Sequence, residues 1–345
     1  MQKAPESEEL LLSHETTKSD VQPRSQLSEV ISFLAFEGHS ARVGLAILTC
    51  LVLFLLAQAL VPWQAIEIPK QWQSLYSWFL ACGLAVGIEQ KFLAKSLYIY
   101  RNTYKMALSG EYENALSHLA QIAPDSAGLV RCPASLYHLR RAEILAQSGN
   151  FELAEYELEI AKPAGVKQEQ YHLAKAGLYK AKGEVDAAKN ELEKLEALIG
   201  FVPAISLEKT LLLLEEPRNV WEAKKELDKL LELPDGPHFT GENTSTLANA
   251  YRNVTKLWTG HAEEGLDGLN DAIHRIKAAA LYVDSLRPIL ASLCIERAYY
   301  LATHKEPDAA VEDLKTSSLL CNFPSQQKRR EAVKEELEWR HNKTL

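Results

Sequence analysis

The chain has 345 residues, of which 47% are hydrophobic and 24% charged, a normal balance for a folded protein of one large domain or two smaller ones. Its formal net charge of -8 argues against a general phosphate-backbone binder, which needs a basic face, so we expect no nucleic-acid partner. Five cysteines without a CxxC spacing indicate reduced, buried thiols rather than a zinc site or a disulfide framework.

The first 40 residues are predicted to be a flexible tail. Residues 1 to about 28 are polar and rich in glutamate and serine, so they cannot bury enough apolar area to offset the entropy of ordering them. Residues 28–38 are more apolar, and their pattern fits a short amphipathic helix on a membrane surface.

Two apolar runs follow, and they predict a transmembrane helical hairpin over residues 41–94. The first span, about 43–63, lies in a stretch from Val43 to Ile66 without a charged residue, which is long enough to cross the hydrocarbon layer. The second span, about 73–94, is less apolar, and a re-entrant or surface helix is its alternative. Basic residues are denser after the second span than in the linker, so the positive-inside rule places both termini in the cytoplasm. The sequence thus predicts a multi-pass membrane protein with two spans.

Two glycines of the second run, Gly83 and Gly87, stand in a GxxxG spacing. Glycine lets helix backbones approach closely, so these positions are predicted to pack against another helix inside the membrane. The first helix of the same hairpin is the favoured partner, and dimerisation is the alternative.

A short pattern recurs through most of the remaining chain: a turn, then a helix with a small residue followed four positions later by leucine. Residues 149–161 show it most plainly, because Ala154 and Leu158 fall on one helical face. The other copies are Ala115–Leu119, Ala188–Leu192, Ala223–Leu227, Gly265–Leu269 and Ala310–Leu314. Recurrence at roughly 34 to 45 residues is typical of a stacked helical repeat, in which each unit buries its apolar face on its neighbours.

These repeats resemble the tetratricopeptide repeat family over about residues 96–323. The resemblance is carried by the turns before the small residue: Gly110-Glu111-Tyr112, Gly149-Asn150-Phe151 and Gly183-Glu184-Val185. It implies an all-α fold in which a solenoid of about six helical pairs occupies residues 95–323 and a capping helix and tail occupy 324–345. The chain departs from the family in lacking the early tryptophan, in having longer spacings after Ala223, and in having a glycine at position 265.

In this family the concave face, formed by the first helices, usually holds an extended peptide or a partner helix. The register implied by the resemblance gives six groove positions: Leu139, Glu143, Leu173, Lys180, Val254 and Tyr299. The resemblance therefore implies a protein or peptide partner. A clean Lys/Asn/Arg set of the kind that clamps a C-terminal carboxylate is not found.

Charged residues also recur at fixed positions of the repeats. The acidic ones are Glu157, Glu191, Glu226 and Asp313, and the basic ones are Arg141, Lys175, Arg252 and Arg297. Stacked repeats align such residues into ladders, which predict either ion pairs within the solenoid, beginning with Arg141 and Glu157, or a face that recognises a charged peptide.

No pattern assembles a nucleophile, a base and an orienting group. HExxH, GxSxG, Walker and GxGxxG motifs are all missing from the sequence, so we predict no enzyme, cofactor, metal or small-molecule substrate. We expect a membrane-anchored scaffold that recruits a protein or peptide to the cytoplasmic face of a membrane. The alternative is an assembly or regulatory subunit that contacts a membrane complex through the hairpin.

Overall fold

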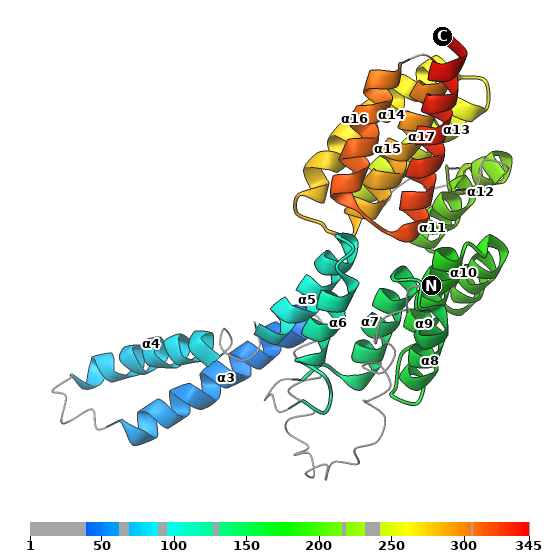
Figure 1. The fold of residues 1–345 in the computed structure, drawn as a ribbon. Helices are drawn as coiled ribbons and strands as arrows, with labels where there is room; N and C mark the ends of the chain where they lie inside the picture. The colour runs from blue at the N-terminus through cyan, green and yellow to red at the C-terminus, as the bar shows by residue number, and fades with distance from the viewer. Residues whose placement is uncertain are drawn as a thin grey trace, which may run out of the picture. The chain divides into compact units, whose positions relative to one another are not determined.

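The computed structural model describes residues 39–61, 69–88, 95–126, 131–215, 219–231, 242–304 and 306–344. Within these ranges the chain forms helices α3 to α17 and no strand, which confirms the predicted all-α fold (Figure 1). The predicted tail lies almost wholly outside the described residues. Two compact units are present: an N-terminal unit up to Leu97 together with Ile122–Pro133, and a repeat unit of Tyr98–Gln121 and Ala134 onward.

The N-terminal unit contains a helical hairpin of α3 (His39–Leu60) and α4 (Lys70–Ile88). Phe54 of α3 stacks on Trp78 of α4 with ring centroids 4.6 Å apart. Small buried side chains let the two helices approach: Ala57, Ser77, Ala81 and Ala85. Other large apolar side chains of the hairpin, such as Phe79, are exposed.

No helix in the described part of the chain combines the length and the apolar content that a membrane crossing requires. The first turn of helix α4 contains Lys70 and Gln73, so only the later part of this 19-residue helix is apolar. The predicted spans over 43–63 and 73–94, and with them the two-span membrane localisation with cytoplasmic termini, are therefore wrong.

The repeat unit is an array of six helix pairs followed by a single helix, as many pairs as the sequence repeat predicts. In chain order the pairs are α5 (Lys95–Leu108) with α6 (Tyr112–Ala120), α7 (Ala134–Gln147) with α8 (Phe151–Ala161), α9 (Gln168–Lys182) with α10 (Val185–Ile199), α11 (Pro203–Leu214) with α12 (Val220–Leu231), α13 (Glu242–Trp258) with α14 (Ala262–Ala280), and α15 (Leu286–Thr303) with α16 (Pro307–Leu320). The last helix is α17 (Pro324–Thr344).

The repeated small residue and leucine lie on the buried face of the second helix of each pair. Ala154 and Leu158 of α8 are fully buried, as are Ala188 and Leu192 of α10. The turn before α10 needs glycine, because Gly183 adopts φ 79° and donates its N–H to the carbonyl of Lys180 at 3.0 Å. The pattern found in the sequence is therefore the pattern by which each helix pair turns and packs.

Helices α13 and α14 lie closer together than an alanine would allow. A Cβ added to Gly265 would stand 2.7 Å from the main-chain nitrogen of Leu257 and 2.8 Å from the main-chain oxygen of Asn253. One turn later, a Cβ on Gly268 would stand 2.5 Å from the side chain of Asn253. The glycine that replaces the usual alanine in this repeat thus permits close backbone packing.

The first helix pair of the repeat unit packs against the last. Leu108, at the end of α5, is fully buried together with Ala291 of α15 and Cys321 after α16. The main-chain N–H of Asn322 donates to the carbonyl of Leu108 at 2.8 Å, and the hydroxyl of Tyr112 donates to the carbonyl of Asn322 at 3.3 Å. We call this contact the seam; through it the array of pairs closes on itself.

Candidate functional site

The first helices of the repeat unit face two adjoining hollows, each of about 230 Å³. The apolar hollow is lined mainly by Tyr100, Leu136, Leu139, Glu143, Leu173 and Leu178. The second hollow is lined by Tyr104, Lys180, Glu208, Glu215, Ser292 and Gln326 and also by the apolar residues Leu211, Pro288, Ile289 and Phe323; we call it the polar hollow after its charged groups. Gln147 and Gly177 line both, so the two hollows adjoin at these residues, and we call the two together the groove.

The apolar hollow lies between helices α5, α7 and α9. Leu173 of α9 is 52% exposed there and stands beside three other lining leucines, Leu136, Leu139 and Leu178. Tyr100 and Glu143 line one wall, and both contact Arg140, whose guanidinium lies 4.7 Å from the ring centroid of Tyr100 and 2.6 Å from the carboxylate of Glu143. Burial acts to lower the pKa of Arg140, but Glu143 and Tyr100 outweigh it and raise that pKa. The hollow is thus apolar at its centre and charged at one edge.

The polar hollow carries one more negative than positive charge around a single lysine. Lys180 Nζ lies 3.2 Å from Glu208 Oε1 and 3.5 Å from Glu215 Oε1. Burial acts to lower the pKa of Lys180, but the two carboxylates raise it, so the ammonium stays charged. Two carboxylates share this one cation, and the Glu208 side chain remains 39% exposed.

The capping helix completes the polar hollow. Gln326 of α17 donates from Nε2 to the carbonyl of Pro288 at 2.7 Å and to Ser292 Oγ at 3.1 Å. Its Oε1 is buried and has no donor within hydrogen-bonding distance among the described residues. Nearby, Arg329 pairs with Glu296; burial raises the pKa of Glu296 even so. Helix α17 therefore contributes a wall of the groove as well as an end to the array.

The structure brings together four of the six predicted groove residues: Leu139, Glu143, Leu173 and Lys180. Val254 is fully buried in the core cluster that joins α11 to α17. Tyr299 packs on Trp258, with ring centroids 5.5 Å apart, and does not line either hollow. The groove stops short of α13 because that helix is enclosed by its neighbours.

The two glycines of the GxxxG spacing lie on the exposed side of α4. A Cβ built on Gly83 or Gly87 meets no described atom within 4 Å. The contact with α3 uses Ala81 and Ala85 instead.

Three of the charged ladder pairs form inside their repeats. Arg141 Nη1 lies 3.1 Å from Glu157 Oε1, and Lys175 Nζ lies 4.0 Å from Glu191 Oε1. In the last pair, Arg297 donates two hydrogen bonds to Asp313, at 2.7 and 2.5 Å. The three acidic side chains are buried: Glu157, Glu191 and Asp313. These pairs hold the two helices of a repeat together and do not line the hollows.

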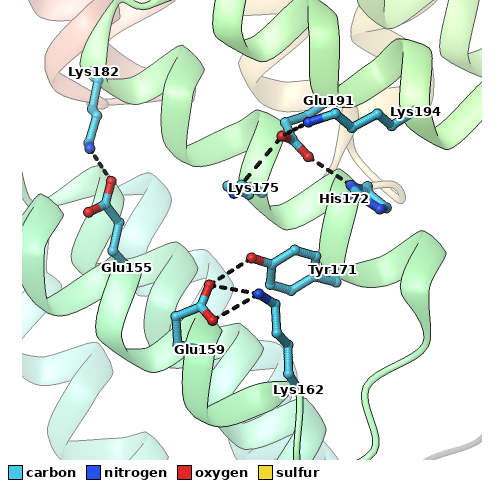
Figure 2. Close-up of polar contacts among 9 residues, drawn as sticks. All are labelled: Glu155, Glu159, Lys162, Tyr171, His172, Lys175, Lys182, Glu191 and Lys194. Atoms are coloured by element: carbon cyan, nitrogen blue, oxygen red, sulfur yellow. Dashed lines mark hydrogen bonds and ion pairs between the residues drawn. The ribbon is translucent and has the colours of Figure 1, made fainter.

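Two histidines also contact these buried carboxylates, and neither was predicted from the sequence. His138 Nδ1 lies 2.6 Å from Glu157 Oε2, and His172 Nδ1 lies 2.7 Å from Glu191 Oε2, as Figure 2 shows for the second pair. Each histidine stands three residues before the basic ladder residue, so the repeated spacing was the available signal. In the same view, Glu159 accepts from Lys162 and from the hydroxyl of Tyr171, which joins α8 to α9.

The helices form stacked pairs, and the first helices of these pairs face a shared groove. This arrangement defines an α-helical repeat protein of tetratricopeptide-like architecture. No family model and no curated protein matches the chain. Among solved structures it is similar to the crystal structure of a tetratricopeptide repeat protein from Parabacteroides merdae ATCC 43184, with 16% identity and a TM-score of 0.35. That match covers 71% of this chain and 98% of the other. A likeness this weak says nothing about function, which must be argued from the groove.

Proposed function

We propose that the repeat unit is a protein-interaction scaffold that holds a segment of a partner protein in the groove. The observation that carries this proposal is Leu173, a large apolar side chain exposed inside a concave, leucine-lined hollow. Apolar surface in a concavity gains free energy when another apolar group displaces the water that covers it. A side chain of a partner is the natural occupant.

The dimensions of the groove favour a peptide segment over a folded surface. A hollow of about 230 Å³ accommodates one or two side chains, and the second hollow continues it past Gly177. A single chain running along the inner face can fill both, whereas a convex protein surface cannot enter two narrow hollows at once. The partner is therefore proposed to bind through an extended or locally helical segment.

The proposed mechanism is non-covalent and non-catalytic. The ionisable side chains of the groove are engaged in ion pairs, Glu143 with the neighbouring Arg140 and Lys180 with Glu208. These pairs suit the recognition of charge on a partner, and we assign no chemical step to them.

The test is a selection of peptides from a random display library with the full chain, followed by affinity measurements. Fluorescence anisotropy would compare the wild type with Leu173→Arg and with Leu319→Arg, a control on α16 where the leucine is 74% exposed and outside both hollows. We expect Leu173→Arg to weaken binding at least tenfold and Leu319→Arg to leave it unchanged. Failure to select any peptide, or equal binding by the Leu173 variant, would contradict the proposal.

A further inference from the structure

We infer that the partner segment places an apolar side chain in the apolar hollow, passes over the backbone of Gly177, and places a basic side chain in the polar hollow. This inference rests on the proposed function and adds the chemistry of the partner. It is carried by three features of the groove: an unexplained glycine, a charge imbalance and the spacing of the two hollows.

Gly177 has no structural reason to be glycine. It lies inside α9, where glycine destabilises the helix relative to alanine. Its φ is not in the left-handed region, and a Cβ added there meets no described atom within 4 Å. An alanine would fit and would stabilise the helix, so neither the turn nor the packing of this chain requires the missing side chain.

The position of Gly177 in the groove explains a glycine that the fold itself does not require. It is exposed and lines both hollows, at the point where one passes into the other. A side chain here would project into the groove between them, whereas glycine lets another backbone approach closely. The partner chain is therefore expected to cross the groove over Gly177.

The polar hollow selects a positive charge. Glu208 and Glu215 contribute two negative charges and Lys180 one positive charge, while Glu296 and Arg329 behind them balance each other. The buried Oε1 of Gln326 adds a further acceptor that no described residue satisfies. A lysine or arginine of the partner would neutralise the remaining charge, and a carboxylate would be repelled in a partly desolvated site where such effects are strong.

The apolar hollow favours an apolar side chain of the partner. Leu136 and Leu139 of α7 and Leu173 of α9 line it, with no unpaired charge at its centre. From Leu173 to Lys180 the helix rises about 10 Å, at 1.5 Å per residue. A partner chain in the polyproline II conformation covers that distance in about three residues, at roughly 3.1 Å each, and its residues i and i+3 point to the same side. The two recognised side chains should therefore be about three positions apart.

The test uses fluorescein-labelled nine-residue peptides, otherwise of serine and glycine, with leucine at position 3 and arginine at position 6. Matched peptides carry glutamate at position 6 or alanine at position 3. Anisotropy with the full chain should show binding of the leucine–arginine peptide and at least tenfold weaker binding of both others. Gly177→Leu should weaken binding at least tenfold. Gly177→Ala is the check that the position tolerates a side chain, and its thermal stability should equal or exceed that of the wild type.

The outcomes separate this inference from the proposed function. If the glutamate peptide binds as tightly as the arginine peptide, or if Gly177→Leu binds like the wild type, and Leu173→Arg still abolishes binding, the inference is wrong and the peptide groove stands. If none of these designed peptides binds although the library yields a peptide sensitive to Leu173→Arg, the inference alone is wrong. If the library yields no peptide, or if binding is indifferent to Leu173→Arg, the groove function and the inference fail together.

Discussion

Asn322 donates its main-chain N–H to the carbonyl of Leu108 at 2.8 Å, although these residues belong to opposite ends of the repeat array. In an open solenoid the first and last repeats each contact a single neighbour, and the ends fray most easily. Here the first pair is also held by the last pair and by Asn322 just after it, through the seam. The stability of the two ends should therefore be coupled.

Leu108→Ala tests this coupling. The side chain is fully buried with Ala291 and Cys321, so its loss should cost about 2–5 kcal/mol of unfolding free energy. Because the seam joins both ends, hydrogen exchange should accelerate in α15 to α17 as well as in α5 and α6. The control is Leu119→Ala, at an equally buried leucine of α6 that is not part of the seam cluster. Unchanged exchange in α15 to α17 of the Leu108 variant would show that the ends are independent.

Gly265→Ala should destabilise the protein although alanine occupies the matching position in the other repeats. The added Cβ would meet main-chain atoms of Leu257 and Asn253, which cannot move without separating α13 from α14. Such overpacking costs about 1–3 kcal/mol, measured as the loss of unfolding free energy in urea. A gain in stability, as the helix propensity of alanine alone would give, would refute the close packing of this pair.

Two further glycine substitutions should have opposite effects. Gly183→Ala should cost about 1–2 kcal/mol, because φ 79° is strained for a residue with a Cβ. Gly177→Ala should raise the unfolding free energy by about 1 kcal/mol, because that glycine lies in an α-helix with open space beside it. Thermal melts of the two variants measured side by side check the contrast, and a stabilised Gly183 variant would contradict the turn geometry.

Glu191→Gln should destabilise the repeat unit in a pH-dependent way. Burial acts to raise the pKa of Glu191, but Lys194, His172 and Lys175 lower it, and the net pKa lies below the usual value of 4.5. A lowered pKa contributes stability that is present above pH 4.5 and is lost as the pH falls through the folded-state value. The variant should therefore lose about 1–3 kcal/mol at pH 7 and less as the pH approaches 3, in urea unfolding series.

Glu193→Gln is the matched control on the same helix, since that side chain is exposed. It should change the unfolding free energy by less than about 0.5 kcal/mol at either pH. A constant difference between wild type and Glu191→Gln from pH 7 to pH 3 would contradict the role of the ionised carboxylate.

The repeat architecture could be predicted because it is local in the sequence. Ala154 and Leu158 mark a buried helical face, and Gly183 marks a turn, whatever lies farther along the chain. Stacking then follows, since one helix pair cannot bury its apolar face alone. The ion pair of Arg141 with Glu157 could be predicted for the same reason: both positions recur at a fixed distance from the turn.

Features that depend on distant contacts could not be predicted. Nothing near Leu108 or Asn322 in the sequence indicates that they meet. Val254 has the groove register, but the core joining α11 to α17 encloses it. The lengths of the two apolar runs suggested membrane spans in the N-terminal hairpin. The run lengths did not show that the second helix, α4, starts earlier and includes Lys70 and Gln73.

Hydrogen–deuterium exchange of the full chain with and without a selected peptide tests the central claim most directly. Peptide binding in the groove should protect α7 and α9, which carry Leu139 and Leu173, together with α11, which carries Glu208. The outer helices α8 and α10 should keep their exchange rates. Protection confined to the outer helices, where Leu153 and Tyr156 are exposed on α8, would place the partner elsewhere and contradict the account.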